Sequence, residues 1–202
     1  MTLSTISSRI SPRTSPHTVA ADNASVATVA PRRRRPVVLV ALGLAVALLM
    51  PLFVSTASAE AQTSTERSYA ISVLHLLNSE RHAHHLGALR NDHHLVSSAR
   101  SHNLAMARAN TMSHQVRGES ALGRRVDRAG YHWTWAGENI GYNGRISRSG
   151  VLALQRAMYN ERAPYNGHRL NILNSHFKNV GIDVYIDRTH HKFWLTSDFG
   201  RK

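Results

Sequence analysis

The stretch Trp133–Asn143, which reads WTWAGENIGYN, constrains the fold most tightly, because it has the pattern of an interior strand that carries one carboxylate. Glu138 lies between Gly137 and Gly141 in a run of aromatic and apolar residues. A glycine inside a strand typically marks a bulge or a close approach of other atoms. A carboxylate in such a run needs solvent, a cation, a hydrogen-bond donor or a metal ion beside it. The simpler alternative is that Glu138 only accepts a hydrogen bond from a buried backbone amide.

Amphipathic segments before and after this stretch predict helices. Residues 66–86 place apolar side chains at i, i+3, i+4 and i+7 and end at Gly87, which indicates a helix with one buried face. Later segments begin at residues that suit an N-cap. The further helices expected are one capped by Asp92, Ser120–Gly130, one capped by Ser147 or Ser149, and the short piece Arg169–Asn174.

Two segments near the end of the chain alternate apolar and polar residues with a period of two, which is typical of half-buried strands. They are residues 180–186 and 193–199, and the polar residues 187–191 between them predict a hairpin loop. Helices first, then strands and helices mixed, then a hairpin, favour an α+β fold. We therefore expect a three-layer α-β-α sandwich with a central antiparallel sheet.

The N-terminal 59 residues have the features of an export signal. Arg32–Arg35 precede the apolar run Val37–Val54, and Ala57-Ser58-Ala59 offers small residues to a signal peptidase. We predict cleavage after Ala59, so that residues 1–59 comprise a disordered stretch and a signal peptide; the alternative is a retained membrane anchor. Residues 60–67 are then a short linker, and residues 68–202 form a single domain.

Composition limits the kinds of stabilisation and the classes of partner that we expect for that domain. The chain contains no cysteine, so an exported form cannot depend on disulfides. The formal net charge of +13 favours contact with anionic polymers or membrane surfaces. We expect a monomer outside the cell or in the cell envelope that contacts a membrane only transiently through its signal segment. Nucleic acid is not an expected partner.

Three residues are candidates to lie beside Glu138: His114, Glu161 and His168. Glu161 continues the apolar face of the fourth predicted helix and lies just before the turn that carries His168, which predicts contact between the two side chains. The alternative is that Glu161 pairs with Arg162 or Arg169 in solvent.

Three other features favour ordinary structural explanations. His102 lies on an apolar helix face, which is typical of a core histidine. Asp198-Phe199-Gly200 spells a kinase motif but has none of the accompanying motifs, so it reads as the end of a core strand. The histidines in residues 82–94 suggest a solvated polar face rather than a metal or pH-sensing patch.

Many short motifs, in one order, resemble the CAP superfamily, which comprises cysteine-rich secretory proteins, antigen 5 and pathogenesis-related 1 proteins. The resemblance is strongest to its bacterial SCP-like extracellular branch and covers residues 68–200. The motifs are Asn78–Arg81, Leu89 with Asp92 and Leu95, Ala105–Ala107, Ser113-His114, Gly137–Gly141, Gly167–Arg169, Asn171–Leu173, Val180–Ile182 and Ser197–Gly200.

The resemblance implies a cleft lined by two histidines and two glutamates, which carry over to His114, Glu138, Glu161 and His168. It also implies that zinc or another divalent cation binds through His114 and His168, because some family members bind metal through these two histidines. The position three residues before Glu161 holds Met158 where the family often has tryptophan, so this sequence departs from the pattern there.

Three functions follow from these residues. The first is a secreted binding module for a divalent metal, a small apolar or lipid ligand, or a cell-wall polymer. The second is an extracellular hydrolase that depends on the His/Glu set, and the third is a structural protein with a vestigial site. The sequence has no cysteine nucleophile, no His-Glu-x-x-His motif and no Gly-x-Ser-x-Gly motif, so common protease and esterase mechanisms are not supported.

Overall fold

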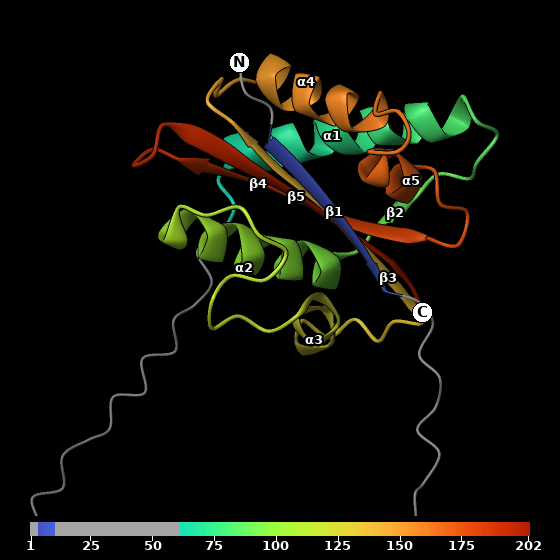
Figure 1. Cartoon of the computed structure of the whole chain (residues 1–202), viewed down its shortest axis with the longest axis horizontal. Coiled ribbons are helices and arrows are strands. Elements are labelled where there is room, and N and C mark those ends of the chain that lie inside the picture. Colours follow the sequence, from blue (N-terminus) through green and yellow to red (C-terminus); the bar gives the residue numbers. More distant parts are fainter. Residues whose placement is uncertain (1–3, 11–60) are drawn as a thin grey trace, which may run out of the picture. The chain divides into compact units, whose positions relative to one another are not determined.

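The computed structural model describes residues 4–10 and 61–202, and it is an α+β fold (Figure 1). The expected helices and strands are all present, with ends shifted by a few residues. Their bounds are β1 (Ser4–Ile10), α1 (Ser64–His82), β2 (Arg90–Asn91), α2 (His93–Ala109), α3 (Leu122–Arg128), β3 (Trp135–Asn143), α4 (Arg148–Tyr159), α5 (Gly167–Ile172), β4 (Asn179–Asp187) and β5 (Lys192–Arg201).

A five-stranded sheet in the order β1-β3-β5-β4-β2 forms the middle layer. The long strands β3, β5 and β4 pair antiparallel, as expected, and β4 and β5 form the predicted hairpin. The exception is β2, whose two residues pair parallel with β4. The stretch that carries Glu138 is therefore an interior strand of the described sheet, with β1 on one side and β5 on the other.

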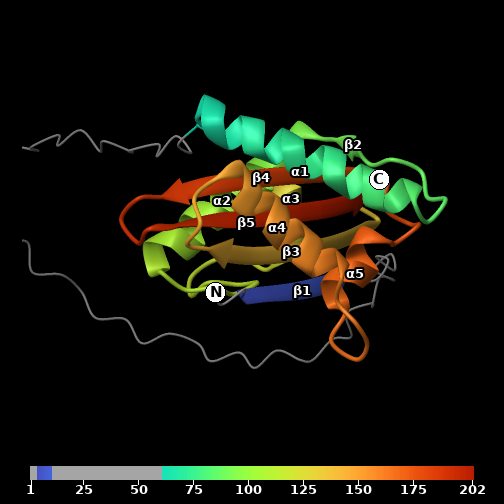
Figure 2. The same cartoon turned by 90° about the horizontal axis from the view of Figure 1, so that it is seen from above.

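Helices cover both faces of this sheet. Helices α1, α4 and α5 lie on one face, and α2 and α3 lie on the other (Figures 1 and 2). The largest apolar cluster packs between α1, α4, α5 and the sheet, and two smaller clusters fill the opposite side beneath α2 and α3. This arrangement confirms the predicted three-layer α-β-α sandwich.

Helix caps fix where two helices begin. Thr63 and Glu66 form a capping box, in which the Thr63 hydroxyl accepts from the Glu66 backbone N–H and the Glu66 carboxylate accepts from the Thr63 backbone N–H. Helix α1 therefore starts at Ser64, so the expectation that residues 60–67 are a linker is wrong from residue 64 onward. Asp92 caps α2 as predicted, because its carboxylate accepts from the His94 and Leu95 backbone N–H groups.

The N-terminal 59 residues are described only in part. We expected no regular structure ahead of the signal, but residues 4–10 form strand β1, paired antiparallel along β3. The apolar run 37–54 and the predicted cleavage point lie outside the described residues, so the signal stays a prediction. Within residues 4–10 and 61–202, no helix is both long and apolar enough to cross a membrane.

Candidate functional site

The structure brings the four predicted residues together as two histidine–carboxylate pairs. His114 lies in the loop after α2, and its Nδ1 is 2.7 Å from Glu138 Oε1. His168 lies in the first turn of α5, and its Nδ1 is 2.5 Å from Glu161 Oε1. Among the described residues, no direct hydrogen bond or ion pair joins one pair to the other.

Glu138 is fully buried because the even-numbered residues of β3 face α2 and α3. Its second carboxylate oxygen accepts a hydrogen bond from Arg125 Nη2 at 2.6 Å, and His102 Nε2 lies 3.7 Å from the same oxygen. The expectation that a buried carboxylate in this strand has a cationic or donor partner is confirmed. The alternative, in which only a backbone amide meets it, is wrong.

Asp198 on β5 lies directly across the strand pair from Glu138, and it is also fully buried. Burial would raise the pKa of Glu138, but His114, His102 and Arg125 together outweigh it and lower that pKa to about 2. Burial and the nearby Glu138 charge raise the pKa of Asp198 well above its ordinary value. The two facing carboxylates therefore have pKa values shifted in opposite directions, with Glu138 the stronger acid.

Glu161 meets His168 as predicted, although from a different position. Helix α4 ends at Tyr159, so Glu161 lies in the following loop rather than on the helical face that we expected. Its carboxylate accepts two hydrogen bonds from His168, one from Nδ1 and one from the backbone N–H at 3.0 Å. Arg169 instead donates to the Tyr159 carbonyl at 2.6 Å, so the alternative pairing of Glu161 with Arg169 does not form.

Side-chain amides join β3 to α5 and so relate the two pairs. Asn139 Nδ2 donates to the His168 carbonyl at 3.1 Å, and Asn171 Nδ2 donates to the Glu138 carbonyl at 3.2 Å. A Cβ atom on Gly137 would come within 2.7 Å of the Phe177 ring, so this glycine allows the close approach that the sequence predicted. Residues 137–139 are thus in contact with the segment that carries His168.

Both histidines offer a free ring nitrogen. The Nε2 atoms of His114 and His168 are buried and have no hydrogen-bond partner in the described part of the chain. In each ring the opposite nitrogen is held by a carboxylate, which is the outer-shell arrangement that fixes the tautomer of metal-binding histidines. Each Nε2 is therefore a candidate metal ligand, because imidazole nitrogen binds zinc and copper. Within residues 4–10 and 61–202, no three His, Cys, Asp or Glu side chains converge as a complete metal site.

Sequence reasoning missed part of this network. Arg125 is 7% exposed and joins Glu138 to Glu119, yet no motif distinguishes it from other arginines of the chain. His102 is a fully buried core residue, as predicted, and its Nδ1 also lies 2.8 Å from Glu119. Four of the histidines in residues 82–94 are exposed, which agrees with a solvated face; these are His82, His84, His85 and His93. His94 is half-buried, and its Nδ1 lies 2.7 Å from the Ala129 carbonyl oxygen.

Comparisons with known proteins place this arrangement in a family. A family model described as "Cysteine-rich secretory protein family" (CAP) matches residues 74–199. No curated protein gives a significant match. Among solved structures, an extracellular SCP-domain protein of Bacillus anthracis is 33% identical with a TM-score of 0.57, and the alignment covers 68% of this chain and 41% of that one.

Two further structures share the fold. A cysteine-rich secretory protein of Staphylococcus aureus is 23% identical with a TM-score of 0.51, covering 70% of this chain and 41% of that protein. An outer surface protein of Borrelia burgdorferi is 15% identical with a TM-score of 0.57, covering 67% and 94%. The chain thus spans less than half the length of the Bacillus and Staphylococcus proteins. By the match over most of its described domain, this chain belongs to the cysteine-rich secretory protein (CAP) family.

Proposed function

We propose that this protein is an exported binding module whose two histidine–carboxylate pairs bind a divalent transition metal through His114 and His168, with zinc as the preferred ion. The observation that carries the proposal is the pair of buried Nε2 atoms that have no hydrogen-bond partner among the described residues, each on a ring whose Nδ1 is held by a carboxylate. Imidazole nitrogen is a preferred ligand of zinc and copper, and water or a ligand would complete the shell. The bound ion would supply a Lewis acid that attracts an anionic or polarisable group.

A hydrolase is the alternative function, and the His114–Glu138 pair argues against a hydrolase that uses Glu138 as its general base. A general base works best when its pKa lies near the operating pH. The pKa of Glu138 is lowered to about 2 by His114, His102 and Arg125, which exceed the opposing effect of burial. Glu138 is therefore suited to holding His114 in place rather than to removing a proton from water.

A small apolar or lipid ligand is the second part of the binding proposal. A cavity of about 310 Å³ lies between α1 and the start of α2, and its lining is mainly apolar. Apolar side chains that enclose a cavity of this size with a few polar groups are typical of small-ligand sites. Its apolar lining includes Ala70, Ile71, Leu74, Val96 and Ile182.

We also propose that the protein acts outside the cell or in the cell envelope after cleavage behind Ala59. The basic, apolar and small-residue segments of residues 32–59 support this proposal, as do structural relatives described as extracellular or outer-surface proteins. Cleavage there would also remove strand β1 from the edge of β3. N-terminal sequencing of the exported protein should begin at Glu60. A protein that begins at Met1, or that stays wholly in the membrane fraction, would contradict this proposal.

One preparation tests the binding proposal. The exported protein is purified without chelators and analysed for metals by mass spectrometry, and a parallel sample is extracted for lipids. We expect zinc or a related metal in the wild type and its loss from the His114→Ala, His168→Ala double variant. His132→Ala, which alters an exposed histidine, serves as the control. Equal metal content in all three proteins would contradict the proposed site.

A further inference from the structure

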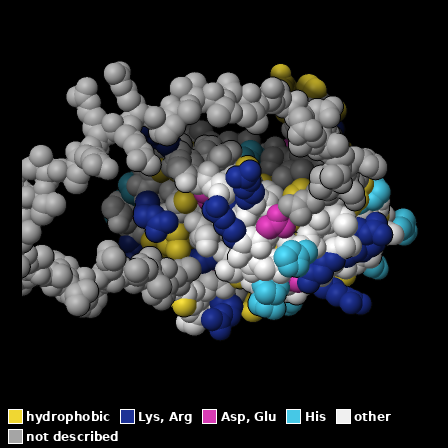
Figure 3. Space-filling view, turned by 90° about the horizontal axis from the view of Figure 1, so that it is seen from below, with side chains coloured by type: hydrophobic (Ala, Val, Ile, Leu, Met, Phe, Trp, Pro, Cys, Tyr) yellow, Lys and Arg dark blue, Asp and Glu magenta, His cyan; other side chains and the backbone are white. Residues whose placement is uncertain are grey.

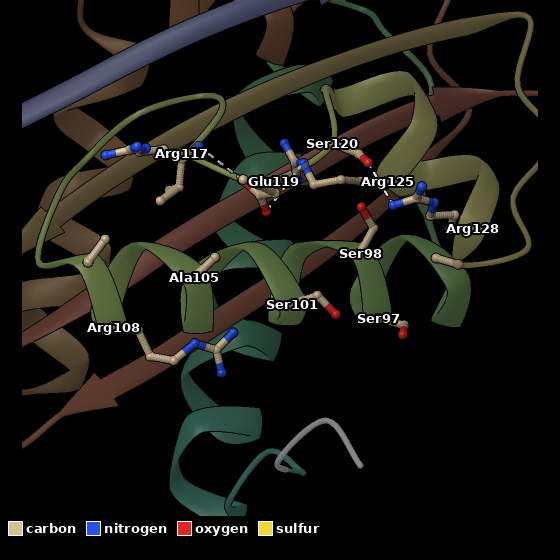
Figure 4. Close-up of a pocket in the computed structure, with 14 residues that line it drawn as sticks. Ser97, Ser98, Ser101, Ala105, Arg108, Arg117, Glu119, Ser120, Arg125 and Arg128 are labelled. Atoms are coloured by element: carbon tan, nitrogen blue, oxygen red, sulfur yellow. Dashed lines mark hydrogen bonds and ion pairs between the residues drawn. The ribbon is translucent and has the colours of Figure 1, made fainter. Parts of the chain in front are cut away.

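A second cavity lies between α2 and the loop that leads into α3, and Arg125, which also donates to Glu138, forms part of its lining. Its volume is about 710 Å³, which is in the range of small-ligand sites. Figure 4 shows its lining, with serines on α2 and arginines on the loop and α3. The polar and charged residues that line it are Ser97, Ser98, Ser101, Arg108, Arg117, Glu119, Ser120, Arg125 and Arg128.

The rim of this cavity carries three arginines that have no acidic partner among the described residues. Arg108, Arg117 and Arg128 are exposed, and no carboxylate of the described residues lies within ion-pair distance of them. Arg128 Nη1 donates to the Ser120 hydroxyl, at 2.6 Å. Figure 3, which looks onto the face of α2 and α3, shows Lys and Arg side chains spread over this surface around a small acidic patch. The rim of the cavity therefore carries an uncompensated positive charge.

The acidic residue of the cavity does not cancel that charge. Glu119 is already engaged by His102 Nδ1 at 2.8 Å and by Arg125 Nε at 3.6 Å. Arg125 is buried, with 7% of its surface exposed. Its Nη1 has no hydrogen-bond partner in the described part of the chain. A buried guanidinium donor without an acceptor is costly, so an acceptor supplied by a ligand would stabilise it.

We propose that this cavity binds the phosphate group of a polyol or sugar phosphate. Guanidinium groups match phosphate oxygens with two parallel hydrogen bonds, and serine hydroxyls suit the hydroxyls of a polyol. Arg117 and Arg128 contact the phosphate from the rim, and Arg125 provides the donor at the base. The same chemistry occurs in a soluble polyol phosphate and in the head group of an anionic lipid. This site is separate from the proposed metal site, which does not involve Arg117 or Arg128.

The test measures binding of two soluble probes, inorganic phosphate and glycerol 3-phosphate, with glycerol as the neutral control. Calorimetry at low ionic strength compares the wild type with Arg117→Gln, Arg128→Gln. Arg90→Gln, Arg188→Gln is the matched control, because it removes the same charge from exposed positions outside the cavity. Loss of two charge-assisted contacts should weaken binding by about tenfold or more, whereas the control pair should change it little.

Two further measurements identify the source of the phosphate and separate this site from the metal site. Vesicles of phosphatidylglycerol and of phosphatidylcholine distinguish a lipid head group from a soluble ester, and either source supports the proposal if binding depends on Arg117 and Arg128. Zinc binding should be the same in all variants, so failure of this site is separable from failure of the metal site. Equal probe binding by both double variants, or no binding by the wild type to any phosphate probe, would overturn the proposal.

Discussion

The two histidine–carboxylate pairs have the same chemistry in different surroundings. In the first pair, Glu138 is fully buried and has three cationic or donor partners, and His114 has a side chain that is 21% exposed. In the second pair the order is reversed, because the Glu161 side chain is 16% exposed and the His168 side chain is 5% exposed. In the first pair the carboxylate is the more buried side chain, and in the second pair the histidine is the more buried one.

This difference separates what each carboxylate contributes. A buried ion that loses its partner is strongly destabilising, because the remaining charge stays in a medium of low polarity. A pair with a partly exposed carboxylate contributes less, because water solvates what remains. We therefore expect Glu138 to affect mainly the stability of the fold, and Glu161 mainly the orientation of the His168 ring.

The largest expected effect is the loss of stability in Glu138→Gln. The variant removes the negative charge that faces Arg125 and His102 but keeps the size of the side chain. Breaking a buried ion pair on one side costs roughly 3–5 kcal/mol of unfolding free energy. Urea unfolding at pH 7 measures the loss, and Glu161→Gln, which alters the partly exposed carboxylate of the other pair, is the matched variant. Equal destabilisation by the two variants would contradict the distinction between the pairs.

The pH dependence of stability gives the second test. The folded-state pKa of Glu138 is lowered to about 2, because His114, His102 and Arg125 outweigh burial. A group with a lowered pKa contributes stability that is present above its unfolded pKa and lost as the pH falls toward the folded value. We expect the wild type to lose stability between about pH 4.5 and pH 2, and Glu138→Gln to lose less over the same interval. Parallel curves would contradict the assignment.

The fold was predictable because it follows from patterns that extend over many residues. The alternation of residues 180–186 and the N-cap at Asp92 each depend on local chemistry, and the structure has both. Strand β1 was not predictable, because Ser4–Ile10 contains few apolar residues and pairs with a strand more than a hundred positions away. Its pairing depends on the open edge of β3, which no local pattern reveals.

Only the site residues that lie in recognisable motifs, or that follow from spacing along the chain, could be predicted from the sequence. Glu138 and His168 lie in recognisable motifs, and the contact between Glu161 and His168 follows from their spacing. Arg125 and Asp198 reach Glu138 through tertiary packing: one comes from α3 and the other from the neighbouring strand. Arg125 carries no sequence signal of this role. The motif around Asp198 does not show that this residue faces Glu138, because strand register sets that pairing.

A smaller loss is expected for Glu161→Gln. The carboxylate accepts two hydrogen bonds from His168, and a glutamine oxygen can replace them only in part. With the side chain partly exposed, the cost should be about 1 kcal/mol. Nitrogen chemical shifts of the His168 ring provide a second measurement, because a weaker acceptor at Nδ1 favours the other tautomer. An unchanged ring and an unchanged stability would show that Glu161 does not orient His168.

The smallest effect is expected for Asp198→Asn. Burial and the charge of Glu138 raise the pKa of Asp198, which favours the protonated form of this side chain in the folded protein. An acid with a raised pKa costs stability as the pH rises above its unfolded value, because the folded state must keep a proton that the unfolded state releases. Asparagine removes that cost, so the variant should match or slightly exceed the wild type at pH 7, by about 1 kcal/mol at most. A loss like that of Glu138→Gln would contradict the raised pKa of Asp198.

The most direct test of the central proposal is a calorimetric titration of the exported protein with zinc. The account predicts one bound ion in the wild type, and loss of most of the binding heat in His114→Ala, in His168→Ala and in the double variant. Binding should weaken as the pH falls, because protons compete with the metal ion for the imidazole nitrogens. The exposed His132→Ala control should titrate like the wild type. Identical titrations of the wild type and the double variant would contradict a metal site at His114 and His168.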